Sequence, residues 1–404
     1  MRVSPWVAQL QKQPSYLRAQ PQLSLQLLDG IRHGVRIGFT GDRTRALDAP
    51  NLGSATKDPA VRALISDIIA ADVAAGKKAG PFDAPPQSDG GTAFCVSPIG
   101  AVPKPGSAQI RVIHHLSYPF GGDSINAGIA PEELSLARFD DACDGVRAER
   151  ARTGRAPLLT KLDVEAAYKQ VPVHPDDRAL LGLRWEGKYY NELVLPFGLR
   201  SSGNRWELYA AALHHFIQHH VGVTLVVHYV DDFLLIDADE ERARRALTET
   251  LALCARLGIP MAERKTEGPC TRLVFLGIEI DTQTMRMQLG EKRLFELRRL
   301  LTHWGGQRTI SQKELQSLTG KLNFAANVVR RGRAYLRRLI DLARELGALP
   351  GNTPKRQHRI TREAMRDICW WRDFIAQWNG HSLLYELEWE KADKFETGAG
   401  RACE

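Results

Sequence analysis

Apolar runs interrupted by single acids mark two parts of the chain. Residues 158–164 form one apolar run that contains Asp163, and this pattern predicts a buried strand that ends at a carboxylate. Residues 224–236 contain two β-prone runs around a short polar segment, which predicts a β-hairpin with Asp231 and Asp232 at its turn. The pattern therefore predicts three acids at the ends of neighbouring strands.

Helical spacing of apolar residues predicts the elements around these strands. Residues 58–76 open with Asp-Pro, a typical helix start, and then place apolar side chains three or four positions apart, at Val61, Leu64, Ile65 and Ile68. Residues 239–257 show the same periodicity and precede Gly258, a typical helix end. Ser311 and Glu314 form a capping box before a third apolar stripe. Together with the strand and the hairpin, these helices predict an α+β fold.

The composition is that of an ordinary globular protein. The chain has 404 residues, of which 43% are hydrophobic and 25% charged. It contains no apolar run of the roughly 18 residues that a membrane span requires, and its start lacks the regions of a signal peptide. The six cysteines form no CxxC pair, so we expect reduced thiols rather than a zinc site or disulfides. These features predict an intracellular protein, cytoplasmic or nuclear, that is not secreted and has no membrane partner.

The net charge of +8 is concentrated in one segment. Residues 291–345 contain 13 Lys and Arg against 5 Asp and Glu, and this surplus equals the net charge of the whole chain. Clustered basic charge is typical of surfaces that bind polyanions such as nucleic acid. A solvated helix face, or arginines paired with nearby acids such as Asp341 and Glu345, is the alternative interpretation.

The acids of the predicted hairpin are costly unless a cation lies between them. Adjacent carboxylates resist joint ionisation, and acids flanked by apolar strands are more expensive than acids in an ordinary surface turn. Carboxylate oxygens suit Mg²⁺, and Asp163 supplies a third acid from the neighbouring strand. Such a site can hold two ions for phosphoryl transfer.

Several blocks in order along the chain resemble the reverse transcriptases of retroelements. The first catalytic block is similar to LDVEAAY at residues 162–168, the positioning block to LPFGL at 195–199, and the catalytic turn to YVDD at 229–232. The blocks that close the palm and grip the primer are similar to residues 257–265 and 275–278. The ordered set spans about residues 93–345 and is more specific than any one block.

The resemblance implies a right-hand polymerase with fingers, a palm whose antiparallel sheet carries the catalytic hairpin, and a helical thumb. It divides the chain into an N-terminal extension with one helix (1–85), the fingers and palm (86–285), a basic thumb (286–345) and a C-terminal connection segment (346–404). The last segment is too short for a ribonuclease H domain, and its acids Glu386, Glu388, Glu390 and Asp393 do not suffice for one. We therefore expect a truncated copy or part of a longer polyprotein.

The resemblance also assigns roles to individual residues. Asp163, Asp231 and Asp232 are expected to be catalytic and to hold two Mg²⁺ ions, or Mn²⁺, with help from the backbone carbonyl of Val164. Tyr168 is expected to be the steric gate that excludes a ribose 2′-hydroxyl. Taken without its spacing from Asp163, it would more often be a packing aromatic.

The remaining expected contacts concern the substrates, a primed RNA or DNA template and dNTPs. Expected nucleotide contacts, besides Tyr168, are Lys104, Arg111, Phe197, Gly198 and Lys265. Expected nucleic-acid contacts are Tyr229, Leu276, Gly277, Arg330, Arg331 and Arg333. Lys104 and Arg111 taken singly are ordinary surface cations, and only a shared triphosphate gives them a common role. The sequence leaves the oligomeric state open.

Some blocks resemble one class of retroelements in particular. RVIHHLSYP at residues 111–119, GPF at 80–82 and ELQSLTGKL at 314–322 are more similar to the tyrosine-recombinase (DIRS-like) retrotransposons than to retroviruses. The acid and the Arg that the retroviral pattern would place near His115 and Ser117 are absent. The segment SSGNRW at 201–206 lacks the Ala-Pro that commonly follows the positioning block, so its template contacts stay open.

Two other functions remain alternatives. An RNA-dependent RNA polymerase uses the same palm, but it would more often have Gly where this chain has Val230 and a smaller or polar residue at Tyr168. A non-catalytic nucleic-acid-binding remnant of a mobile element is the other alternative, and the intact acids argue against it.

Overall fold

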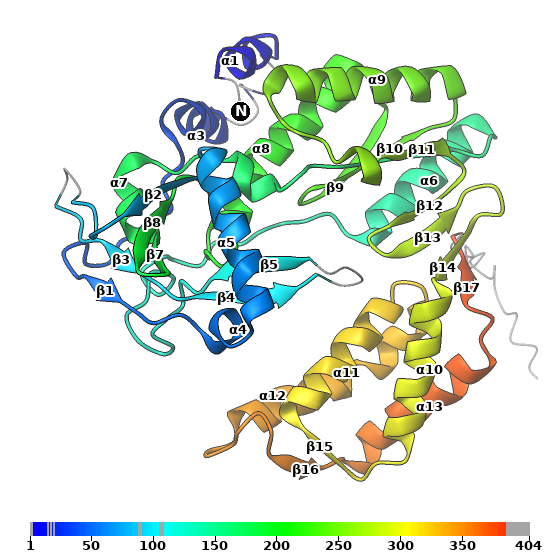
Figure 1. Ribbon diagram of the computed structural model, residues 1–404. Helices are drawn as coiled ribbons and strands as arrows, with labels where there is room; N and C mark the ends of the chain where they lie inside the picture. The colour runs from blue at the N-terminus through cyan, green and yellow to red at the C-terminus, as the bar shows by residue number, and fades with distance from the viewer. Residues whose placement is uncertain are drawn as a thin grey trace, which may run out of the picture. The chain divides into compact units, whose positions relative to one another are not determined.

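The computed structural model describes residues 3–13, 16, 18, 21–87, 91–104 and 109–384. These residues form two compact units (Figure 1). Unit 1 comprises Met1–Arg138 and Thr160–Pro269, and unit 2 comprises Phe139–Leu159 and Cys270–Glu404. The units do not follow the predicted domain boundaries, because one helical segment before residue 160 groups with the C-terminal part of the chain.

Unit 1 contains two sheets and a separate hairpin. A five-stranded sheet has the order β1 (Leu47–Asp48), β3 (Cys95–Val96), β7 (Gly182–Trp185), β8 (Lys188–Glu192), β2 (Lys78–Phe82). A four-stranded sheet has the order β11 (Glu267–Cys270), β6 (Leu158–Asp163), β10 (Asp232–Asp237), β9 (Leu225–Tyr229). The hairpin consists of β4 (Ile99–Pro103) and β5 (Ile110–His114).

The helices of unit 1 come from all parts of its sequence. The α-helices are α1 (Val3–Gln11), α3 (Pro21–His33), α4 (Gly53–Thr56), α5 (Pro59–Ala74), α7 (Pro175–Arg178), α8 (Ser202–Phe216) and α9 (Glu240–Leu257). Shorter turns are η1 (Ala167–Gln170), η2 (Ala179–Leu181), η3 (Ile217–Val221) and η4 (Glu263–Lys265).

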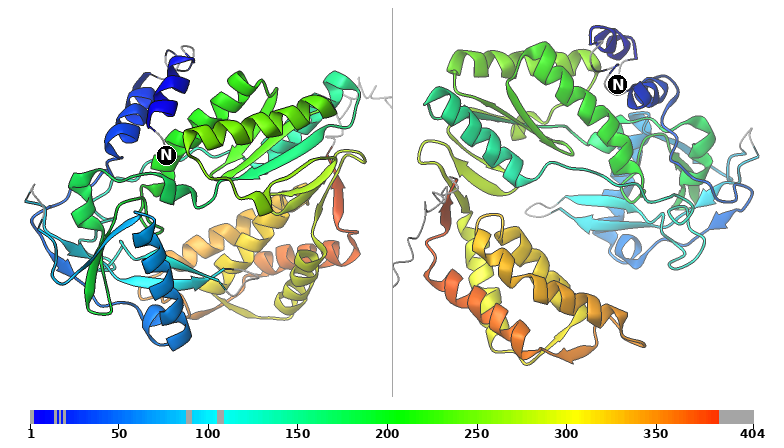
Figure 2. Two further views of the ribbon diagram at one scale, coloured as in Figure 1. Left: turned by 45° about the horizontal axis from the view of Figure 1, so that its top comes forward. Right: turned by 180° about the vertical axis from the view of Figure 1, so that it is seen from behind.

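Unit 2 combines a sheet with a helical part (Figure 2). Its four-stranded sheet has the order β12 (Arg272–Phe275), β13 (Ile278–Asp281), β14 (Arg286–Leu289), β17 (His381–Leu383), and a smaller sheet pairs β15 (Thr309–Ser311) with β16 (Gln357–Arg359). The helices are α6 (Phe139–Thr153), α10 (Glu291–Gly305), α11 (Gln312–Ala325), η5 (Arg330–Tyr335), α12 (Arg337–Ala348) and α13 (Arg362–Gln377).

The predicted strand, hairpin and helices are confirmed. β6 ends at Asp163, and β9 and β10 pair as an antiparallel hairpin. The backbone N–H of Ala60 donates to the side chain of Asp58 at 2.9 Å at the start of α5, and Gly258 ends α9 in the left-handed conformation at φ 73°. Ser311 and Glu314 form the predicted capping box.

Helix α5 buries a face that differs in part from the predicted one. Ile65 is buried as expected, whereas Leu64 is exposed and Asp72 is buried. The apolar pattern misses Asp72 because partner groups decide whether a polar side chain is buried, and its partner Lys169 comes from a distant segment.

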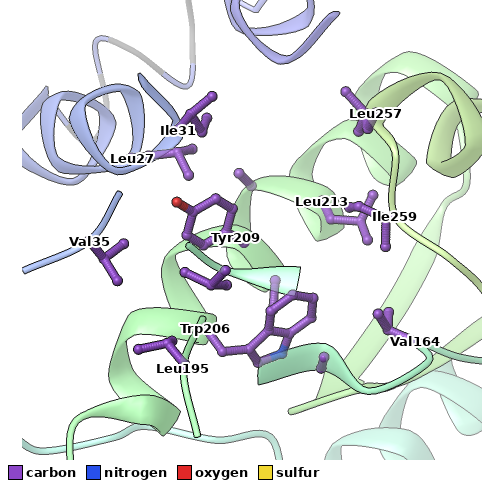
Figure 3. Packing of buried hydrophobic residues seen from close by; sticks show 14 of the residues in the cluster. Leu27, Ile31, Val35, Val164, Leu195, Trp206, Tyr209, Leu213, Leu257 and Ile259 are labelled. Carbon is purple, nitrogen blue, oxygen red and sulfur yellow. The ribbon is translucent and has the colours of Figure 1, made fainter. Parts of the chain in front are cut away.

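The N-terminal part corrects the prediction of an extension with one helix over residues 1–85. It contains α1, α3, α4 and α5, and the first two belong to the main core of unit 1. Trp6 is completely buried and packs edge-on against Tyr209, with ring centroids 5.7 Å apart. In Figure 3, Leu27 and Ile31 of α3 lie beside Tyr209. The two helices are short and rich in Gln, so their apolar stripes are too sparse to be recognised from spacing alone.

Two further expectations concern cysteines and membranes. The described cysteines Cys95, Cys143, Cys254, Cys270 and Cys369 are free thiols, as predicted, whereas Cys403 lies outside the described residues. Within the described ranges, no helix has both the length and the apolar character needed to cross a bilayer. The tail after residue 384, with the acids discussed for ribonuclease H, also lies outside the described residues.

Candidate active site

The turn between β9 and β10 is held in an unfavourable conformation by the core. Tyr229 and Asp232 are paired, and Val230 between them has a φ of 57°, in the left-handed region that β-branched residues rarely adopt. The indole of the fully buried Trp206 donates to the carbonyl of Val230 at 2.8 Å, and Val164 donates its N–H to the carbonyl of Asp231 at 2.9 Å. These bonds tether the turn to α8 and to the end of β6.

Three carboxylates meet near this turn. Asp163 is buried at the end of β6, and both of its oxygens accept from the ammonium of Lys265, at 2.9 and 2.8 Å. Burial, followed by repulsion from Asp231 and Asp163, raises the pKa of Asp232 to about 6. Burial and the charge of Asp163 also raise the pKa of Asp231. The carboxylates are therefore close enough to repel one another.

This donor set fits a hard divalent cation by its chemistry. Carboxylate oxygens are the preferred ligands of Mg²⁺, and a cation would remove the repulsion that raises the two pKa values. Lys265 supplies positive charge at the same place, and its hydrogen bond to Asp163 raises the pKa of its own ammonium. Within the described part of the chain, no three or more His, Cys, Asp or Glu side chains are arranged to hold a metal ion.

A cavity of ≈ 970 Å³ opens beside the carboxylates in unit 1. Of the expected site residues, those that line it are Lys104, Arg111, Asp163, Val164, Tyr168, Phe197, Asp231 and Lys265. Asp232 lines a neighbouring cavity of ≈ 480 Å³ together with Asp163 and Lys265. Residues that are far apart in the sequence thus share one concave surface, and the expected site residues on it include two acids and three cations.

One wall of the cavity is built from aromatic rings. The rings of Tyr168 and Phe197 pack at 5.4 Å between centroids, and the guanidinium of Arg111 lies over Phe197 at 5.0 Å. Burial, followed by the charge of Asp231, raises the pKa of Tyr168, so its hydroxyl stays protonated at neutral pH. Lys104, just past β4, donates to the side chain of Gln109 at 3.0 Å.

The backbone after Phe197 explains the glycine of the positioning block. Gly198 has a φ of 107°, and a Cβ at this position would lie 2.0 Å from the carbonyl oxygen of His114. Asn126 donates to the carbonyl of Gly198 and accepts from the N–H of Arg200, both at 2.8 Å. No role could be predicted for Asn126, or for Trp206 at the end of the segment 201–206, because only the fold brings these side chains to the site.

The other expected residues do not line this cavity. Tyr229 ends β9 and is partly exposed. Leu276 and Gly277 form the turn between β12 and β13 of unit 2, both with positive φ. Arg330, Arg331 and Arg333 belong to η5 of unit 2 rather than to an α-helix. Arg330 and Arg333 form ion pairs with Asp140, at 3.4 and 2.9 Å, so part of the basic surplus is used inside the unit.

Comparison with known proteins identifies relatives of the central part of the chain. Residues 102–280 match the family described as reverse transcriptase (RNA-dependent DNA polymerase). The genome polyprotein of Petunia vein clearing virus (isolate Shepherd) is 23% identical over 191 residues, which is 47% of this chain and 8% of the polyprotein. The chain thus spans less than a tenth of this relative. The central part of the chain is similar to reverse transcriptases, and the matches do not single out the DIRS-like class.

Solved structures share the fold. The foamy viral protease-reverse transcriptase in complex with RNA/DNA hybrid has a TM-score of 0.60 at 16% identity, covering 85% of this chain and 39% of that chain. The dRH form of that protein in complex with double-stranded DNA has a TM-score of 0.58 at 19% identity, covering 85% and 51%. The predicted α+β polymerase fold is therefore confirmed.

Proposed function

We propose that this chain is an RNA-directed DNA polymerase that extends a primer with dNTPs by metal-assisted nucleotidyl transfer. The observation that carries the proposal is the shared cavity, which the carboxylates of Asp163 and Asp231, the Tyr168–Phe197 wall and the cations of Lys104, Arg111 and Lys265 all line. The family match over residues 102–280 and the foamy viral neighbours solved with RNA/DNA hybrid support the same activity. They do not favour the RNA polymerase or the non-catalytic remnant.

The carboxylates have the first role in this proposal. Asp163, Asp231 and Asp232, with the carbonyl of Val164, would hold two Mg²⁺ ions, or Mn²⁺. When bound, such ions make a primer 3′-hydroxyl more acidic and stabilise charge on the departing pyrophosphate. The tethers from Trp206 and Val164 fix the turn before substrate arrives, so little reorganisation is needed.

The remaining residues bind and select the nucleotide. Lys104 and Arg111 would contact the triphosphate, and Lys265 would neutralise charge near Asp163. Tyr168, braced by Phe197, would exclude a 2′-hydroxyl. Gly198 would keep the backbone close to the β4–β5 hairpin.

We assign the polymerase subdomains on the same basis. Unit 1 would supply the fingers and palm, and α10 to α12 of unit 2 the thumb. The turn with Leu276 and Gly277 would be the primer grip, and Tyr229 and the exposed Arg331 of η5 would contact nucleic acid, whereas Arg330 and Arg333 pair with Asp140. The DIRS-like class remains our preferred origin, because of the sequence blocks at residues 111–119 and 314–322.

One assay tests the proposal. Purified protein is given poly(rA) primed with oligo(dT), labelled dTTP, and Mg²⁺ or Mn²⁺. We expect extension with either ion and none with EDTA. The RNA polymerase alternative predicts extension with UTP on an RNA primer instead, and the remnant predicts binding of the primed template with no extension in any mixture.

A further inference from the structure

Four charged side chains from four elements of unit 1 meet next to its cavity. We call them the buried charge network: Asp72 of α5, Lys78 of β2, Lys169 of η1 and Glu192 of β8. The ammonium of Lys169 binds both oxygens of Asp72, at 2.6 and 2.8 Å. Lys78 lies 3.8 Å from Asp72 and forms an ion pair with Glu192. Lys169 also lines the cavity, so the network reaches the substrate space.

The network has no net charge, and most of its side chains are buried. Its two ammonium groups and two carboxylates cancel, and the side chains of Lys78, Glu192 and Asp72 are only 4%, 6% and 10% exposed. Apolar residues of similar size would often be equally stable at such positions. The property that a buried ion pair offers beyond an apolar contact is a fixed geometry, because each charge is satisfied in only one arrangement.

One end of the network holds the segment that carries Tyr168. Lys169 directly follows Tyr168 in η1, a turn that begins after Ala166 in a left-handed conformation with φ 48°. The turn has few internal hydrogen bonds. In one of them, the backbone N–H of Lys169 donates to the carbonyl of Ala166 at 2.8 Å. The pairing of Lys169 with Asp72 therefore ties this short turn to the long helix α5.

The other end of the network lies beside the buried His114, whose backbone N–H donates to the carbonyl of Phe197 at 2.8 Å. Burial lowers the pKa of His114 to about 3, so the ring is neutral, and its Nε2–H donates to the carbonyl of Gly182 at 3.1 Å. Nδ1 then carries no hydrogen, and it lies 3.9 Å from Glu192 without a hydrogen bond. The network is therefore tied to the aromatic wall through Lys169, and His114 only packs against Glu192.

We propose that the buried charge network positions Tyr168 against Phe197 and thereby sets the selectivity for deoxyribonucleotides over ribonucleotides. The inference rests on the proposed function and adds Asp72 and Lys169 as positioning residues. Neither side chain needs to touch the sugar. They act by preventing the Tyr168 ring from moving away from Phe197 and opening room for a 2′-hydroxyl.

The main test measures sugar selectivity in primer extension with Mg²⁺. The ratio of kcat/KM for dTTP to that for UTP does not depend on the folded fraction of a preparation, so it separates positioning from stability. We expect Asp72→Asn and Lys169→Gln each to lower this ratio on the order of 10-fold. The double variant should lower this ratio no further than either single variant, because each substitution removes the same ion pair between Asp72 and Lys169. Lys169→Arg, which keeps the cation, should retain most of the ratio.

A matched control uses the same helix. Arg62 of α5 forms an ion pair with Glu186 at 3.0 Å in which both side chains are about half exposed. Arg62→Gln removes an ion pair from α5 without touching the network, and we expect an unchanged ratio. If Asp72→Asn is poorly folded, Lys169→Gln carries the test, since Lys169 is the most exposed member of the network.

Amide hydrogen exchange gives a readout that needs no catalysis. In Asp72→Asn, we expect exchange to accelerate about 10-fold in residues 167–171 and 197–198, but not in Arg62→Gln. An active enzyme with an unchanged sugar ratio in Asp72→Asn would overturn the inference and leave the proposed function intact. Wild-type protein without any extension would end the proposed function, and with it the role in selectivity. Unchanged exchange would overturn the positioning role in either case.

Discussion

The acidic site of unit 1 and the basic segment of unit 2 differ in how far their charges are balanced within the fold. In unit 1, burial and then the mutual repulsion of three carboxylates raise the pKa of Asp231 and Asp232. In unit 2, the arginines pair with acids of the same unit, Arg333 with Asp140 at 2.9 Å and Arg338 with Asp367 at 2.5 Å. The first site needs a positive ligand, whereas the second is already partly neutralised.

The difference teaches which kind of sequence evidence points to a ligand. The acids were conspicuous because apolar strands flank them, and a carboxylate in such a place is costly unless something binds it. The arginines were conspicuous only by number, and a count of charges does not reveal acids that arrive from a distant helix such as α6. Apolar context therefore predicts a site better than net charge does.

The largest effect in our predictions is the loss of a carboxylate from unit 1. We expect Asp231→Asn or Asp163→Asn to reduce primer extension on the order of 10³-fold or more, because each removes a charged oxygen ligand from the proposed metal site. Binding of the primed template should change little. Glu240→Gln, on the exposed start of α9, is the control and should extend normally. Near wild-type extension by either Asn variant would contradict the metal role.

The second prediction concerns the aromatic wall beside the carboxylates. Tyr168→Val removes a ring that packs on Phe197, so UTP should be accepted roughly 10 to 100 times better relative to dTTP, equivalent to about 1.4–2.7 kcal/mol. The measurement is the ratio of kcat/KM for the two nucleotides, and overall rate should also fall. A constant ratio would make Tyr168 a packing residue and would favour the RNA polymerase alternative.

The sequence predicted the local secondary structure better than the tertiary contacts between distant residues. The strand that ends at Asp163, the hairpin and the capping box of Ser311 and Glu314 depend on neighbours in sequence, and all are confirmed. The buried Asp72 and the anchor Trp206 depend on contacts with Lys169 and Val230, which no spacing rule connects to them. The roles of the site residues stay predictions, because geometry places a side chain without measuring what it binds.

We expect low pH to destabilise unit 1 more than unit 2. Burial, followed by the charge of His228, lowers the pKa of His214 to about 4, and burial lowers that of His114 to about 3. Both rings belong to unit 1. A histidine with a lowered folded pKa stabilises the protein above its unfolded value of about 6.5 and loses this contribution as pH falls towards the folded value.

The expected loss is roughly 2–3 kcal/mol for each of the two histidines between pH 6.5 and 4, since one pKa unit corresponds to about 1.4 kcal/mol, and the raised pKa of Asp232 offsets part of it. Hydrogen exchange resolved by peptide measures each unit separately. Peptides of α8 and β9 should lose protection in this range before those of α10 and α13. His214→Gln should reduce the difference between the units. Equal loss of protection in both units would show that these histidines do not set the acid response.

The smallest expected effect concerns two arginines of the basic segment, one that pairs with an acid of unit 2 and one that is exposed. Arg330 is partly buried and lies 3.4 Å from Asp140, whereas Arg331 is exposed in the same short turn. If Arg331 contacts a phosphate, Arg331→Gln should lower the slope of log affinity against log salt by about 0.9, equally for all duplex sequences, and leave the melting temperature unchanged. Arg330→Gln should instead lower the free energy of unfolding by about 1 kcal/mol, with little change in the salt slope.

Salt titrations of duplex binding and thermal melts of both variants make the comparison. A normal salt slope in Arg331→Gln would mean that the charge surplus of residues 291–345 serves the structure of unit 2, and the proposed thumb would then need another surface to hold its duplex.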